Sequence, residues 1–191
     1  MIQKAIKNGN KKTGRKWSKI VIIVEGVYSM EGTIVDLPKL IEIKKKYKCY
    51  LYIDEAHSIG AVGSYGGGVV DYFNCNPNDV DLLMGTMTKT FAAAGGYIAC
   101  SRDVANHIRA HSISNYSGSM SAPVCQQIID MLDIVARASS DSESIGKKKI
   151  DNLLKNTHYL RDKLTELGFV LYGHYDSPVI PILVYFPTMA G

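Results

Sequence analysis

The sequence of 191 residues lacks the patterns of a metal-binding, disulfide-stabilised or membrane-spanning protein. Its four cysteines are widely spaced and form no Cys-x-x-Cys pair, which argues against zinc and thioredoxin-like redox sites and fits reduced thiols in a cytosol-facing protein. We recognise no signal-peptide pattern in these residues, and no apolar run approaches the roughly 20 residues that span a bilayer. We therefore expect that this chain does not cross a membrane by itself. Repeats and low-complexity tracts are also absent.

The excess of positive over negative charge is small, with a formal net charge of +4. Much of the excess lies in the first 19 residues, which contain lysines and arginine but no acid. This run could contact phosphate or an anionic membrane, but a solvated helix end and loop is the favoured interpretation, because charge runs are usually solvated. Without interleaved aromatic residues, the run does not indicate nucleic-acid binding. The hydrophobic content of 46% is typical of a globular protein.

The apolar pattern predicts an α/β fold with a mostly parallel sheet flanked by helices. Residues 20–24 form a continuous β-branched run, which is typical of a strand buried on both faces. A helix opened by Pro38 follows, and further strands are predicted at 49–53, 81–84 and 96–100. The strand–helix–strand order predicts a right-handed parallel crossover.

The second half of the sequence changes to a helical period. Helices are predicted at 104–111, around residues 124–135 and at 147–167, the last of them ended by Gly168. Two strands, 169–172 and 179–186, would then begin a new unit that lacks sheet partners. We therefore expect a fragment or truncated chain, with part of a large domain in 1–168 and the incomplete start of a C-terminal α+β domain in 169–191.

Polar residues follow two of the predicted strands. Asp54 and His57 come after the strand at 49–53, and Lys89 follows the strand at 81–84. In open α/β sheets, ligands bind at this carboxyl edge. Lys89 could form a Schiff base with the aldehyde of pyridoxal 5'-phosphate (PLP), and Asp54 could face its ring nitrogen. Thr86 and Thr88, with nearby glycines, could hold its phosphate.

These residues allow two other interpretations. Taken singly, Asp54 could cap a turn, His57 could be an ordinary polar residue and Lys89 a solvated loop lysine, but their joint arrangement favours a cofactor site. Residues 54–57 also spell the Asp-Glu-Ala-His motif of some NTPases. That function needs an upstream phosphate loop, which this sequence lacks.

Three segments carry a family resemblance. Residues 25–32, 52–60 and 85–96 resemble the α-oxoamine synthases, PLP enzymes that join an amino acid to an acyl-CoA with loss of carbon dioxide. Residues 68–73 and 79–81 are most similar to the catalytic subunit of eukaryotic members that condense L-serine with palmitoyl-CoA to 3-ketodihydrosphingosine. The resemblance covers roughly residues 17–187 and implies the fold type I (aspartate aminotransferase-like) large domain. Glycine or alanine as the amino acid stays an alternative.

The resemblance also implies roles for individual residues. Lys89 would carry the cofactor and act as the base at the substrate Cα, and Asp54 would pair with the pyridinium nitrogen. His57 would lie near the phenolic oxygen, and Thr86 and Thr88 would lie on the phosphate side. Ser29 would either reach the polar edge of the ring or serve as a turn residue, and both interpretations stay open. No metal is implied.

This sequence departs from the family pattern at several positions. Gly67 stands where relatives usually have arginine, and Gly118 where they usually have threonine. Ala92 and Ala93 replace residues that are often glycine, and the histidine that stacks on the cofactor would precede this chain. A non-catalytic subunit with the same fold is a further alternative, which the presence of Lys89 argues against.

The resemblance implies partners and a location as well. We expect a related second subunit or a second copy of the chain, with the active site at their interface. The expected location is the cytosolic face of the endoplasmic reticulum membrane, with membrane association through parts outside this chain.

Overall fold

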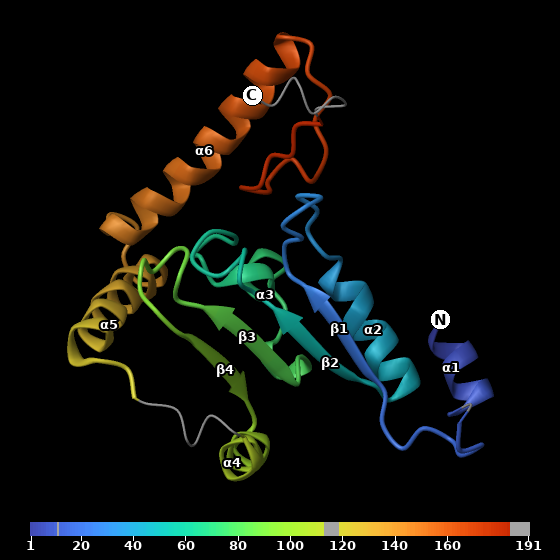
Figure 1. The fold of residues 1–191 in the computed structure, drawn as a ribbon. Coiled ribbons are helices and arrows are strands. Elements are labelled where there is room, and N and C mark those ends of the chain that lie inside the picture. The colour runs from blue at the N-terminus through green and yellow to red at the C-terminus, as the bar shows by residue number, and fades with distance from the viewer. Residues whose placement is uncertain (11, 113–118, 184–191) are drawn as a thin grey trace, which may run out of the picture.

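The fold is built around a four-stranded sheet, which Figure 1 shows in the computed structural model of residues 1–10, 12–112 and 119–183. The strand order is β1 (Val21–Glu25), β2 (Tyr50–Asp54), β3 (Leu82–Thr86) and β4 (Gly96–Cys100). The first three strands are parallel, and β4 is antiparallel to β3. The four strands predicted between residues 20 and 100 and the parallel crossover are confirmed.

Six helices are present in the described residues. They are α1 (Ile2–Asn8), α2 (Leu37–Tyr47), α3 (Gly68–Tyr72), α4 (Arg102–His111), α5 (Ala122–Ala136) and α6 (Ile145–Glu166). Short 3-10 turns occur at Pro77–Asp79 and Arg137–Ser139. In α2, the Asp36 side chain accepts a hydrogen bond from Lys39 N at 3.2 Å, and Pro38 lies in the first turn, as predicted. None of these helices combines the length and apolarity that a membrane span requires.

The main core lies between the sheet and the α2–α3 layer. Side chains alternate along β2, so Leu51 and Ile53 point into this layer while Tyr50 is exposed. They form one buried cluster with residues of α2, α3 and the turn before β3: Leu37, Ile41, Val69 and Val80. This layer fixes the carboxyl ends of β1 and β2 relative to each other.

The prediction that residues 20–24 are buried on both faces is wrong. Ile22 and Val24 pack against the core, but Ile23 between them is 70% exposed. The reason is the two-residue period of a strand, which sends Ile23 to the sheet face opposite the α2–α3 layer.

The strands predicted at 169–172 and 179–186 are also not formed as such. The described part of this region has a single bridge, between Leu171 and Ile182, and residues 184–186 lie outside the described residues. Instead, this C-terminal segment returns along α6 to the loop after β1 (Figure 1), where His174 N donates to Gly32 O at 2.9 Å. The guanidinium of Arg161 in α6 holds this segment by donating hydrogen bonds to Tyr172 O at 3.0 Å and Val179 O at 2.9 Å. The boundary at 168 stays a prediction.

The basic run at the N-terminus is solvated, as favoured from the sequence. Lys4 and Lys7 lie exposed on α1, and residues 12–19 are exposed as well. None of the four cysteines, all of which lie in the described residues, forms a disulfide, and their reduced state stays a prediction.

Candidate active site

The loops after β1, β2 and β3 converge at one edge of the sheet. Glu25 and Asp54 are paired in register at the ends of β1 and β2, and Asp54 is paired with Met84 of β3. Backbone hydrogen bonds extend this pairing beyond the strands, because Gly26 N donates to Asp54 O at 2.8 Å and Glu55 N donates to Met84 O at 2.6 Å. The turn after β2 is therefore held from both sides.

Lys89 and His57 meet at this edge. Lys89 Nζ lies 2.9 Å from His57 Nε2, although the two residues come from different loops. The pKa of His57 is lowered, first by partial burial and then by the positive charge of Lys89, while the carboxylates of Glu25 and Asp54 oppose this shift. His57 is therefore favoured as a neutral imidazole, whose Nε2 can accept a hydrogen bond from the Lys89 ammonium.

Asp54 is half-buried at the end of β2. Its Oδ1 accepts a hydrogen bond from Ala56 N at 2.8 Å, which shapes the turn toward His57. Its charge acts on His57, so the two side chains share the same electrostatic environment. The structure thus brings Asp54, His57 and Lys89 to one edge, while their chemical roles stay predictions.

Thr86 and Thr88 lie side by side at the start of the loop between β3 and β4. Their hydroxyl oxygens are 2.7 Å apart, Thr88 N donates to Thr86 Oγ1 at 3.1 Å, and Thr86 Oγ1 donates to Gly95 O at 3.2 Å. The Phe91 side chain, only 1% exposed, anchors the middle of the loop. Lys89 is thus carried by an exposed loop with fixed ends and a buried anchor.

Two departures from the family pattern have local structural consequences. Ala92 has a φ of 48°, a left-handed conformation that favours glycine, so alanine is strained at this position. At Gly67, an added Cβ would lie 2.8 Å from Asp71 Cβ, so a larger residue there would require Asp71 to move. Gly118 lies outside the described residues.

Glu55 is a structural residue of the candidate site, and the sequence does not reveal its contacts. Its side chain is 2% exposed, and its carboxylate accepts hydrogen bonds from the Ser58 hydroxyl and from Val69 N, the latter at 3.2 Å. Burial raises the pKa of Glu55, and the hydrogen bonds from Ser58 and Val69 oppose this effect. Because Glu55 and Ser58 flank His57 in the same turn, they hold the backbone from which the imidazole projects.

Ser29 is not brought to the Lys89–His57 pair by any described contact. It is exposed, and its backbone N donates to Glu25 Oε2 at 3.3 Å, so the structure assigns it a place in the turn after β1. Its predicted role at the cofactor ring is untested. The described residues also contain no group of three or more side chains arranged to hold a metal ion.

Comparison with known proteins gives a consistent set of relatives. Residues 2–188 match the aminotransferase class I and II family. Serine palmitoyltransferase 2 of Caenorhabditis elegans is 54% identical over 192 residues, which cover 100% of this chain and 34% of that protein. Human serine palmitoyltransferase 3 is 50% identical over 188 residues, covering 98% of this chain and 34% of that protein. The chain thus spans about a third of the length of these curated relatives.

A solved structure with the same fold is a serine palmitoyltransferase variant from S. paucimobilis with a bound PLP–myriocin aldimine. It superposes with a TM-score of 0.78 at 24% identity, over 94% of this chain and 45% of that one. The predicted fold type I architecture is therefore confirmed.

Proposed function

This chain belongs to the aminotransferase class I and II family, and we propose that it carries the lysine site of a PLP-dependent serine palmitoyltransferase. The proposed reaction condenses L-serine with palmitoyl-CoA, releasing carbon dioxide and CoA and giving 3-ketodihydrosphingosine. The names of the curated relatives support this substrate pair. The observation that carries the proposal is the 2.9 Å contact of Lys89 Nζ with His57 Nε2, at the sheet edge that also bears Asp54.

The chemistry of the side chains at this edge fits PLP. Lys89 offers an amine for the aldehyde, Asp54 a carboxylate for the ring nitrogen, and His57 an imidazole for the phenolic oxygen. The adjacent hydroxyls of Thr86 and Thr88 fit the phosphate. When bound, PLP would supply an electron sink for the negative charge that forms at the Cα of serine.

The protein's own residues would prepare and move the protons. The Asp54 carboxylate would favour a protonated ring nitrogen, because an opposite charge stabilises the charged form. Lys89 would take the proton from Cα and return one later. Because the pKa of His57 is lowered, its neutral Nε2 would accept a hydrogen bond from the Lys89 ammonium and keep the amine in place between these steps.

The proposal includes a partner and a location. We propose that the full-length protein pairs with a related second subunit or with a second copy of itself, and that it acts at the cytosolic face of the endoplasmic reticulum membrane. Both follow from the family resemblance. Co-purification with the partner and membrane fractionation would test them, and recovery of a soluble monomer would contradict both.

An absorption titration tests the cofactor and the substrate. The purified full-length protein with PLP should show a visible band that changes on addition of L-serine but not of glycine or L-alanine. Lys89→Ala should abolish the band, whereas Lys149→Ala, a change at an exposed lysine of α6, should leave it intact. A visible band that persists in Lys89→Ala would refute the assignment of Lys89. A response to glycine or alanine alone would replace serine as the substrate.

A further inference from the structure

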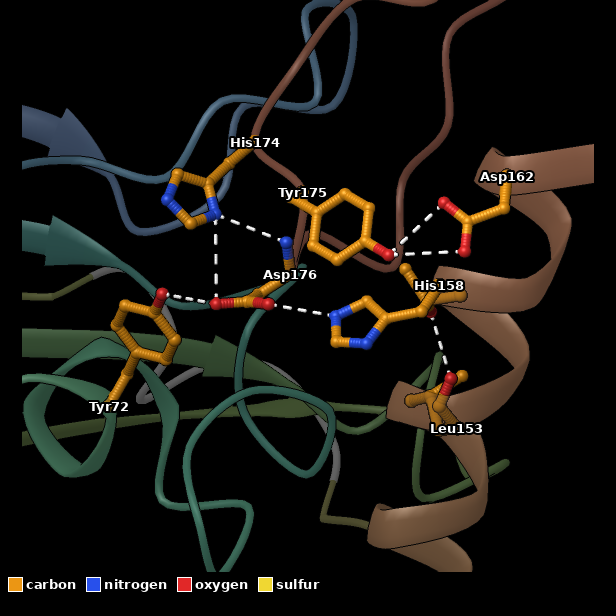
Figure 2. A network of polar contacts seen from close by, with 8 residues as sticks. Tyr72, Leu153, His158, Asp162, His174, Tyr175 and Asp176 are labelled. Atoms are coloured by element: carbon orange, nitrogen blue, oxygen red, sulfur yellow. Dashed lines mark hydrogen bonds and ion pairs between the residues drawn. The ribbon is translucent and has the colours of Figure 1, made fainter. Parts of the chain in front are cut away.

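Asp176 connects three parts of the chain that are far apart in the sequence. Figure 2 shows its carboxylate between Tyr72 at the end of α3 and His158 of α6. Tyr72 donates its hydroxyl hydrogen to Oδ2 at 2.6 Å, and His158 Nε2 lies 2.8 Å from Oδ1. His174 Nδ1, in the same C-terminal segment, lies 4.0 Å from Oδ2 and accepts a hydrogen bond from Asp176 N at 3.1 Å.

The charge states of this group strengthen the contact with α3. Burial and the hydrogen bond to Asp176 together raise the pKa of Tyr72 to about 12, so its hydroxyl remains a donor. Burial acts to raise the pKa of Asp176, but the hydrogen bonds from Tyr72 and His158 outweigh it and lower that pKa. The Tyr72–Asp176 contact is therefore a hydrogen bond to a carboxylate, which is about twice as strong as a neutral one.

Helix α3 leads from this contact to the candidate active site. It is only five residues long, and Tyr72 is its last residue. At its other end, Val69 N donates to the Glu55 carboxylate, and Gly68 approaches so closely that an added Cβ would lie 2.5 Å from Glu55 Oε2. Glu55 in turn belongs to the turn that carries His57. One short helix is thus held by Asp176 at one end and by Glu55 at the other.

We propose that Asp176 is a positioning residue for the Lys89–His57 pair and that it acts through Tyr72, α3 and Glu55. This inference deepens the proposed function and rests on it. Docking of the C-terminal segment through Asp176 would fix α3, and α3 would fix the turn from which His57 reaches Lys89. Loss of the Tyr72–Asp176 hydrogen bond would loosen that turn without removing any group that touches the cofactor.

Three variants of the full-length protein separate this link from a general loss of stability. Tyr72→Phe removes only the hydroxyl on α3, and Asp176→Asn removes the charge that it contacts. Asp162→Asn is the matched control, because Asp162 of α6 contacts Tyr175 OH at 3.1 Å at the outer side of the same cluster. Figure 2 shows that this control contact lies apart from Tyr72.

Two measurements are compared across these variants. In the apo protein, Tyr72→Phe and Asp176→Asn should each speed amide exchange at residues 68–72 roughly tenfold, as expected for the loss of one hydrogen bond to a charged group. With PLP, both should also weaken the affinity measured from the visible band roughly tenfold and shift the band. Asp162→Asn should change both quantities less than about twofold.

The outcomes separate the inference from the proposed function. Unchanged exchange at residues 68–72 in both variants would overturn the link between Asp176 and α3. Faster exchange with an unchanged visible band and PLP affinity would overturn the link between α3 and the site, and would reduce Asp176 to a purely structural residue. A wild-type protein without any visible band would refute the proposed function, while the exchange measurement would still decide the link to α3.

Discussion

Gly26 is the position at which the packing around Glu55 can be tested most sharply. It follows β1, and an added Cβ would lie 2.6 Å from Ser58 Oγ, 2.9 Å from Glu55 Oε2 and 3.1 Å from Val69 Cγ1. These three neighbours are at most 2% exposed, so none can move into solvent without opening the core. Gly26→Ala should therefore push directly on the hydrogen bonds that hold the His57 turn.

The expected cost follows from two contributions. Adding a methyl group to a well-packed interior costs about 1–3 kcal/mol. Displacing the Ser58 hydroxyl from Glu55 leaves a buried polar group without its partner and adds about 1–3 kcal/mol. Taking about 2 kcal/mol from each, we expect Gly26→Ala to lower the free energy of unfolding by roughly 4 kcal/mol, a large part of the stability of a typical domain.

Urea unfolding of the full-length protein, followed by circular dichroism, would measure this loss. Gly14→Ala is the control at an uncrowded position, because no atom lies within 4 Å of an added Cβ there. Its φ of 66° adds left-handed strain of about 1–2 kcal/mol, which Gly26 does not have. In a Ser58→Ala background, Gly26→Ala should cost about half as much, since the nearest contact is gone. A Gly26→Ala loss below about 1 kcal/mol would refute the tight packing described for Glu55.

Three further predictions concern the site and its surroundings. Phe91→Ala should lower the free energy of unfolding by about 3–5 kcal/mol, because it leaves a cavity at a buried position. The PLP affinity measured from the visible band should also fall, because Phe91 anchors the Lys89 loop. A normal PLP affinity would contradict this anchoring. In the folded protein, the pKa of Asp176 lies below its ordinary value of 3.8. The ionised Asp176 therefore stabilises the fold fully above pH 3.8, and this stabilisation is lost as the pH falls through the lowered pKa. Asp176→Asn should thus be about 1–2 kcal/mol less stable at pH 7, with the difference disappearing in acid denaturation; a constant difference would contradict the lowered pKa. Burial and the Glu55 and Asp54 carboxylates raise the pKa of Tyr97 to about 12, so Tyr97→Phe should not alter the ultraviolet titration of tyrosine below about pH 11.

The sequence predicted which strand ends carry the candidate site residues better than it predicted the loop contacts that position them. Strands ending before Asp54 and Lys89 were recognisable from apolar runs followed by polar residues, and parallel pairing necessarily brings such ends together. The contact between His57 and Lys89 depends on two loops, and their backbone path is set by bonds such as Thr86 Oγ1 to Gly95 O. No periodicity in the sequence reports such bonds.

The two failed predictions have different physical causes. The run at 20–24 is apolar at every position, so composition could not show that Ile23 faces away from the α2–α3 layer. The predicted strands of the C-terminal segment do not form, because Arg161 of α6 binds two of its backbone carbonyls. In addition, its Asp176 contacts Tyr72 of α3 and His158 of α6. In the C-terminal segment, long-range contacts therefore outweigh local propensity.

The adjacent carboxylates of Asp54 and Glu55 differ in burial, and this difference separates a candidate functional residue from a structural one. At the end of β2, the alternation of side chains sends Asp54 to the face that bears the site and Glu55 into the interior. Asp54 stays half-buried and acts electrostatically on His57, whereas Glu55, with its raised pKa, is enclosed by Ser58 and α3. Under the proposed function, a carboxylate would be needed at both positions for different reasons. Asp54 would supply charge at the candidate site, and Glu55 holds the turn on which His57 meets Lys89.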